Sequence, residues 1–124
     1  MNEKKKIFII DDDPDILELL NYNLTKAGYE TIQAASGLGA LWEFQGEGLP
    51  DLILLDLMMP SPDGYEICRF LKNSSGLQQI PVVIISAKGA KDNIDRVFSL
   101  GAEAYLPKPF SIDQLLYVVN RWAH

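Results

Sequence analysis

Aspartates follow two apolar runs of this chain, and a lysine lies near its end. The triplet at 11–13 follows IFII at 7–10, and Asp56 follows LILL at 52–55. Such short runs are typical of strands buried on both faces of a parallel sheet, where chemistry collects beyond the carboxyl ends of the strands. We therefore expect the carboxylates to meet at one edge of a sheet. Because crowded carboxylates repel one another, this arrangement calls for a hard cation such as Mg²⁺ or for a lysine such as Lys108.

The three adjacent aspartates are expected to have different roles. Asp13 directly precedes Pro14, which is the pattern of a helix N-cap followed by the first helical residue. Asp11 and Asp12 then have no cap role left to fill, so we interpret them as metal ligands. Proteins usually hold Mg²⁺ with few carboxylate oxygens, and water molecules complete the octahedron.

Asp56, Ser86 and Lys108 are predicted to form the reactive part of the same edge. The turn signals after Asp56 come only at 60–64, which leaves its carboxylate free to react. A carboxylate can attack phosphorus and form an acyl phosphate when a metal ion reduces the repulsion between the two anions. Ser86 follows another apolar run, and Lys108 would bind the oxygens of a transferred phosphoryl group. Pro109 permits a cis peptide bond after Lys108.

Length and composition limit the classes of protein to consider. The 124 residues predict a single domain spanning 1–124, with an apolar fraction of 48%. The net charge of −6 argues against direct binding of nucleic acid by this domain. No run approaches the roughly 18 apolar residues of a membrane span, and the N-terminus lacks a signal-peptide core, so we expect a cytoplasmic protein with no membrane partner. The single Cys68 is expected to be a packing residue.

Apolar runs alternate with helical patterns along the chain, which indicates a parallel sheet wrapped by helices. We expect strands at 6–10, 30–34, 51–55, 81–85 and 104–106. We expect helices from an Asp13 cap to Gly28, from Ser36 to about Phe44, from about 62–64 to Asn73, at 91–100, and from a Ser111 cap to about Trp122.

The order of these motifs resembles the receiver domain of two-component response regulators, the family of the chemotaxis response regulator. The resemblance covers nearly the whole chain. It implies a flavodoxin-like (βα)5 three-layer α/β sandwich with a five-stranded parallel sheet of order 2-1-3-4-5. It rests on Asp11-Asp12, on Asp56 followed by MPSPDG at 59–64, on Ser86-Ala87, on Gly101-Ala102, and on Tyr105 with Lys108-Pro109-Phe110.

The resemblance also implies a reaction and a set of site residues. A sensor histidine kinase or a phosphotransfer protein would donate a phosphoryl group from phosphohistidine to Asp56, in a reaction that depends on Mg²⁺. Such a receiver is a signalling phosphoacceptor rather than an enzyme, with weak self-phosphorylation and self-dephosphorylation activity. The implied metal ligands are Asp12, Asp56 and the backbone carbonyl of Met58, with Asp11 acting through water, and the implied phosphoryl ligands are Lys108 and Ser86.

The resemblance further implies a conformational switch. New phosphoryl charge would draw the Ser86 hydroxyl inward, and the aromatic ring of Tyr105 would rotate into the vacated space. The surface formed by 91–100, 104–106 and 111–122 would then change shape and control an output domain or partner protein.

The output surface departs from the family pattern at several positions. Ala104, Tyr117 and Val118 replace charges that receivers of DNA-binding regulators use there for dimerisation. Tyr117 and Val118 are instead candidates for an apolar docking patch. The sequence is compatible with a stand-alone regulator and with the front end of a longer one.

Two functions from other classes compete with this interpretation. Phosphohydrolases of the haloacid dehalogenase type use Asp-x-Asp followed two residues later by Thr or Val, but Asp15 occupies that position here. A receiver-like scaffold that binds partners without phosphorylation would not require the acidic residues, all of which are present. A dinucleotide-binding domain is disfavoured because no Gly-x-Gly-x-x-Gly follows the first strand.

Overall fold

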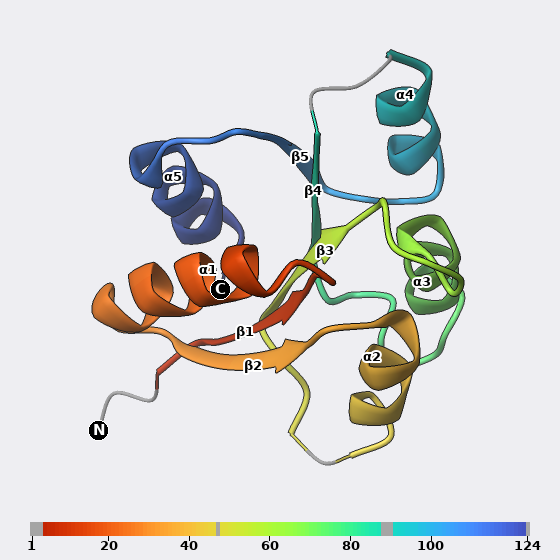
Figure 1. Cartoon of the computed structure of the whole chain (residues 1–124). Helices are drawn as coiled ribbons and strands as arrows, with labels where there is room; N and C mark the ends of the chain where they lie inside the picture. Colours follow the sequence, from red (N-terminus) through yellow and green to blue (C-terminus); the bar gives the residue numbers. More distant parts are fainter. Residues whose placement is uncertain (1–3, 47, 88–90, 124) are drawn as a thin grey trace.

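Strands and helices alternate strictly in a computed structural model that describes residues 4–46, 48–87 and 91–123 (Figure 1). The strands are β1 (Lys6–Ile10), β2 (Glu30–Ala34), β3 (Leu52–Asp56), β4 (Val82–Ala87) and β5 (Ala104–Lys108). The helices are α1 (Pro14–Lys26), α2 (Gly37–Glu43), α3 (Gly64–Lys72), α4 (Lys91–Ser99) and α5 (Ile112–Trp122).

The strands form one parallel sheet of order β2-β1-β3-β4-β5, which confirms the predicted fold. Helices α1 and α5 cover one face, and α2, α3 and α4 cover the other (Figure 1). The carboxyl ends of β1, β3, β4 and β5 therefore lie along one edge of the sheet, where the sequence placed the reactive residues.

The apolar run of β3 shows why the centre of this sheet is so hydrophobic. Leu52 and Leu54 pack with α1 and α5, whereas Ile53 and Leu55 pack with α2, α3 and α4. All four side chains are fully buried, and burial of each stabilises the fold by about 1.5–3 kcal/mol. Because both faces of the strand are covered, its sequence has no polar alternation.

Side chains cap the helices largely as the sequence predicts. Asp13 caps α1 and accepts a hydrogen bond from the amide of Asp15 at 2.9 Å. Ser111 caps α5 in a reciprocal capping box with Gln114. Helix α1 ends at Lys26 with Ala27 as its C-cap, and Gly28 follows with a φ of 99°, as expected of the glycine that ends a helix. None of the helices in the described ranges is long and apolar enough to cross a membrane.

The strands extend further toward the site than the sequence indicated. Asp56 is the last residue of β3 rather than the first residue after it, and it pairs with Ile85 of β4. Strand β4 includes Ser86, and β5 continues to Lys108, which pairs with Ala87. The ladder hydrogen bonds thus hold these site residues in the sheet, which is more rigid than a connecting loop.

Candidate functional site

Three aspartates meet at the carboxyl edge of the sheet. Carboxylate oxygens of Asp11, Asp12 and Asp56 lie within 4.8 Å of one another. Asp11 and Asp56 are almost completely buried, with 1% and 4% exposure, whereas Asp12 is exposed. The expected cluster is therefore present, with one side open to solvent.

Lys108 reaches into this cluster from the end of β5. Its Nζ lies 2.9 Å from Oδ2 of Asp11 and 3.6 Å from Oδ1 of Asp56. Burial lowers the pKa of Lys108, but hydrogen bonds and charges from Asp11 and Asp56 outweigh that effect, so the pKa is raised. Lys108 is accordingly a cation that partly neutralises the cluster.

Asp11 also has a local structural role that the sequence interpretation did not assign. Its Oδ1 accepts a hydrogen bond from the amide of Asp13 at 2.9 Å, while its Oδ2 is paired with Lys108. Asp13 remains the helix cap, as expected, and the Asp11 carboxylate orders the turn that leads to it.

The surroundings of Asp56 make its carboxyl group a weaker acid than usual. Burial raises its pKa to about 6, and the neighbouring charges of Asp11 and Asp12 also raise it. The Lys108 charge and the amide of Met58, which lies 3.4 Å from Oδ1, act in the opposite direction. The anionic form is thus under-compensated by Lys108 alone, as expected for a site that receives a cation.

Ser86 lies on β4, the strand beside β3, and Tyr105 lies on β5, the next strand along the sheet. Ser86 is 5% exposed and pairs in register with Pro107, next to the pair formed by Ala87 and Lys108. Tyr105 is partly buried, and its hydroxyl donates a hydrogen bond to the carbonyl of Ala87 at 3.0 Å. The structure therefore links the ring of Tyr105 to the strand end that carries Ser86.

Residues 7–120 match the sequence family described as the response regulator receiver domain. The chain belongs to this family. It is 34% identical over 118 residues to the polar-differentiation response regulator DivK of Brucella ovis, and the match covers 95% of each protein. The structure resembles that of the chemotaxis protein CheY4 of Vibrio cholerae with a TM-score of 0.90 and 28% identity, covering 97% of this chain and 99% of the other.

Longer regulators are related to this receiver as well. The chain is 40% identical over 116 residues to RpaA of Synechocystis sp., a DNA-binding dual master transcriptional regulator, and the match covers 90% of this chain but 46% of RpaA. The receiver thus spans about half the length of the curated transcriptional regulators it matches. Membership of the family establishes a two-component signalling domain of the flavodoxin-like CheY fold and implies phosphoacceptance on an aspartate.

The loop after Asp56 is ordered by a residue that the sequence interpretation did not single out. The side chain of Glu66 accepts hydrogen bonds from the Ser61 hydroxyl and the Asp63 amide, both at 3.1 Å. Asp63 in turn accepts one from the Glu66 amide at 2.9 Å. The spacing Asp-x-x-Glu is a capping-box signal, so the sequence contained this information.

Cis peptide bonds precede both Pro62 and Pro109. The sequence analysis expected only the one before Pro109.

The expected output surface carries exposed aromatic groups in the described part of the receiver. Tyr117 is 69% exposed, Val118 is partly buried, and both line a groove between β5 and α5 together with Tyr105. The predicted apolar patch is therefore accessible. Whether a partner binds there remains a prediction.

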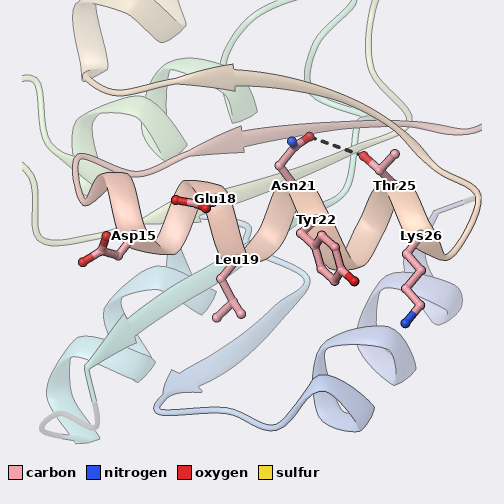
Figure 2. A pocket seen from close by; sticks show the side chains of 7 residues that line it. All are labelled: Asp15, Glu18, Leu19, Asn21, Tyr22, Thr25 and Lys26. Carbon is pink, nitrogen blue, oxygen red and sulfur yellow. Dashed lines mark hydrogen bonds between the residues drawn. The ribbon is translucent and has the colours of Figure 1, made fainter.

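A second exposed apolar surface lies along α1, which begins beside the aspartate cluster. Figure 2 shows Leu19, Tyr22 and Lys26 projecting from one side of the helix and Asn21 and Thr25 from another. Leu19 is 39% exposed and Tyr22 is 62% exposed. These side chains line a shallow pocket whose lining residues all belong to α1 and include none of the three clustered aspartates.

Proposed function

We propose that this receiver accepts a phosphoryl group on Asp56 from the phosphohistidine of a sensor histidine kinase or phosphotransfer protein, in a Mg²⁺-dependent reaction. The observation that carries the proposal is the buried Asp56 carboxylate, 3.6 Å from Lys108 and clustered with Asp11 and Asp12. A buried carboxylate supplies a nucleophile, and the lysine supplies positive charge where phosphoryl oxygens would lie.

The residues at the site fit Mg²⁺. Their donors are oxygen atoms, and burial, together with the charges of Asp11 and Asp12, raises the pKa of Asp56 despite the opposing charge of Lys108. Asp12, Asp56 and the carbonyl of Met58 would hold the ion, and Asp11 would act through water. When bound, Mg²⁺ supplies charge that reduces the repulsion between the Asp56 carboxylate and the incoming phosphoryl group.

In the proposed transfer, an Asp56 oxygen forms a bond to phosphorus while the phosphorus–nitrogen bond to the donor imidazole breaks. The electron pair of that bond returns to the imidazole nitrogen. Lys108 stabilises the charge on the phosphoryl oxygens, and the Ser86 hydroxyl donates a hydrogen bond to one of them. Water reverses the modification by attacking phosphorus, which breaks the phosphorus–oxygen bond to Asp56 and releases inorganic phosphate and the free carboxylate. The weak self-phosphorylation and self-dephosphorylation expected of the domain belong to this same site.

Phosphorylation is proposed to act on the surface formed by α4, β5 and α5. Ser86 and Lys108 lie near the ends of β4 and β5, the strands that lead toward α4 and α5. Movement of the Ser86 hydroxyl toward the phosphoryl group would free space for the ring of Tyr105, whose hydroxyl now bonds to Ala87. This shape change would control an output domain or partner protein.

The relatives support two forms of output. RpaA is a DNA-binding regulator of about twice this length, whereas DivK is matched along nearly its whole length. The net charge of −6 leaves any DNA contact to another domain, as in a regulator of the RpaA kind, or to a partner protein. The donor must approach the open side of the site, so Leu19 and Tyr22 on the adjacent α1 are candidates to contact it. A cytoplasmic location remains a prediction.

The experiment that tests this function is intact-mass measurement after incubation with acetyl phosphate, with and without Mg²⁺. The wild type should gain a single Mg²⁺-dependent phosphoryl adduct that Asp56→Asn lacks. Asp95→Asn on the exposed side of α4 is the matched control and should be labelled normally. Labelling of Asp56→Asn would refute the site assignment. A wild type that forms no adduct and leaves the donor intact would favour a phosphorylation-independent scaffold, and rapid donor turnover without an adduct would favour a phosphohydrolase.

A further inference from the structure

Two glycines outside the acidic cluster lie against the backbone of the loop that follows Asp56. Gly64 is the first residue of α3, and Gly37 is the first residue of α2. Both are buried. They approach opposite ends of residues 57–63, the segment that carries Met58.

Gly64 holds the beginning of this loop. Its amide donates a hydrogen bond to the carbonyl of Leu57 at 3.1 Å. A Cβ at Gly64 would lie 2.4 Å from both the carbonyl oxygen of Asp56 and the Cα of Leu57, whereas ordinary contacts begin at 3.4 Å. Any side chain would therefore push α3 and the end of β3 apart by about 1 Å. The atoms in the way belong to backbone, so rotation of a side chain cannot relieve the contact.

Gly37 holds the other end. A Cβ there would lie 2.0 Å from the carbonyl oxygen of Pro62 and 2.7 Å from its Cγ. Gly37 is distant from Asp56 in sequence, and its helix has no part in the acidic cluster. Its contact with Pro62 nevertheless fixes where the loop ends, next to the capping box that begins α3.

We propose that Gly37 and Gly64 are positioning residues that clamp the 57–63 loop, so that the backbone of Met58 faces the Asp56 carboxylate. This inference rests on the proposed function, because Met58 is the residue whose carbonyl would bind Mg²⁺ and whose amide already lies 3.4 Å from Asp56 Oδ1. In this way the clamp fixes the backbone amide and carbonyl of Met58, an exposed loop residue, relative to the site side chains that the sheet holds.

The chain provides a matched control in Gly39, two residues from Gly37 in the same helix. A Cβ at Gly39 would meet only the Ser36 hydroxyl at 3.2 Å and the Ala34 methyl at 3.7 Å. Gly39→Ala therefore adds the same methyl group to α2 without displacing the loop. Leu24→Ala is a second control, since it opens a cavity in the core on the other face of the sheet and lowers stability away from the loop.

The test compares Gly37→Ala and Gly64→Ala with both controls, at a temperature where each variant is folded. A displacement of about 1 Å in a reacting group costs about 100-fold in rate, so the initial rate of labelling by acetyl phosphate should fall by about that factor in Gly64→Ala. Loss of a group that orients a metal ligand costs about 10-fold or more in affinity, so Mg²⁺ binding measured by calorimetry should weaken correspondingly. Gly37→Ala should change both in the same direction, while Gly39→Ala and Leu24→Ala should match the wild type.

A clamp also predicts a change that needs neither metal nor phosphoryl donor. The amide resonance of Met58 should shift in Gly37→Ala and stay in place in Gly39→Ala. The proposal would be overturned if Gly37→Ala had a wild-type Met58 resonance, Mg²⁺ affinity and labelling rate. If Gly64→Ala does not fold, Gly37→Ala alone provides the test. A wild type that forms no adduct would instead refute the proposed function, and the Met58 resonance would still test the clamp.

Discussion

Replacing Asp56 by asparagine should make the protein more stable near neutral pH in the absence of Mg²⁺. The side chain is 4% exposed and close to two other carboxylates, and burial together with these charges raises its pKa from 3.8 to about 6. A buried anion with a raised pKa opposes folding wherever it is ionised. The amide of asparagine has nearly the same shape and carries no charge, so the variant should lose this unfavourable contribution.

The magnitude follows from the difference between the folded and unfolded pKa values. Below pH 3.8 the carboxyl group is protonated in both states and contributes nothing. As the pH rises toward 6, the unfolded state loses its proton first, so the free energy of unfolding falls. Above pH 6 the loss is complete and amounts to about 3 kcal/mol. Since the amide must also be desolvated, we expect a net gain of about 1–3 kcal/mol at pH 7.5 for Asp56→Asn, and less than about 1 kcal/mol at pH 4.5.

Urea unfolding of the wild type and Asp56→Asn at both pH values, in the presence of EDTA, measures this difference. Asp95→Asn, which removes an exposed carboxylate, should change stability little at either pH. Adding Mg²⁺ should narrow the gap at pH 7.5, because an ion that binds only the folded wild type stabilises it by mass action. An Asp56→Asn variant that is less stable than the wild type at pH 7.5, or a gap that does not change with pH, would refute the reasoning.

Four further variants separate the roles of the remaining site residues from that of the helix cap. Lys108→Ala should retain Mg²⁺ binding but move the stability transition of Asp56 to higher pH, since the lysine charge lowers the pKa of Asp56; urea titrations across pH 4.5–8 would show it. Asp12→Ala should weaken Mg²⁺ binding in calorimetry more than Asp13→Ala, which should instead cost about 1 kcal/mol of stability as a lost helix cap, and the reverse order would mean that the two roles are exchanged. Ser86→Ala should bind Mg²⁺ normally but label more slowly with acetyl phosphate, and an unchanged rate would exclude the hydroxyl from transfer.

The parts of this structure that were predictable from sequence are those set by local patterns of side chains. The buried run of β3 and the caps at Asp13 and Ser111 follow from the types of a few neighbouring residues. The meeting of Asp11 and Asp56 follows from parallel strands whose carboxyl ends share an edge. Each of these inferences needs only short-range information and a handedness rule.

The missed features depend on contacts that sequence patterns do not encode. Strand ends were placed too early because the ladder between β4 and β5 continues beyond their apolar residues to Lys108. The bond from Asp11 to the amide of Asp13 depends on the turn geometry after β1. The contact of Gly37 with Pro62 joins segments whose approach depends on how two helices pack on one face of the sheet. The capping box formed by Asp63 and Glu66 differs from these features, because its Asp-x-x-Glu spacing can be read directly from the sequence.

The energetics of Asp56 explain why the site would bind a cation but not how it would switch. Ionisation of the buried Asp56 lowers the free energy of unfolding by about 3 kcal/mol. This destabilisation shifts an equilibrium between two folded conformers only if it is larger in one conformer than in the other. Moving a two-state equilibrium from 1:99 to 99:1 requires about 5.5 kcal/mol of differential binding. The Tyr105 hydroxyl bond to Ala87 contributes about 0.5–1.5 kcal/mol, so its loss alone cannot supply that difference. The proposed switch would therefore need further contacts that differ between the two conformers, such as those proposed for Ser86 and Lys108 with a phosphorylated Asp56.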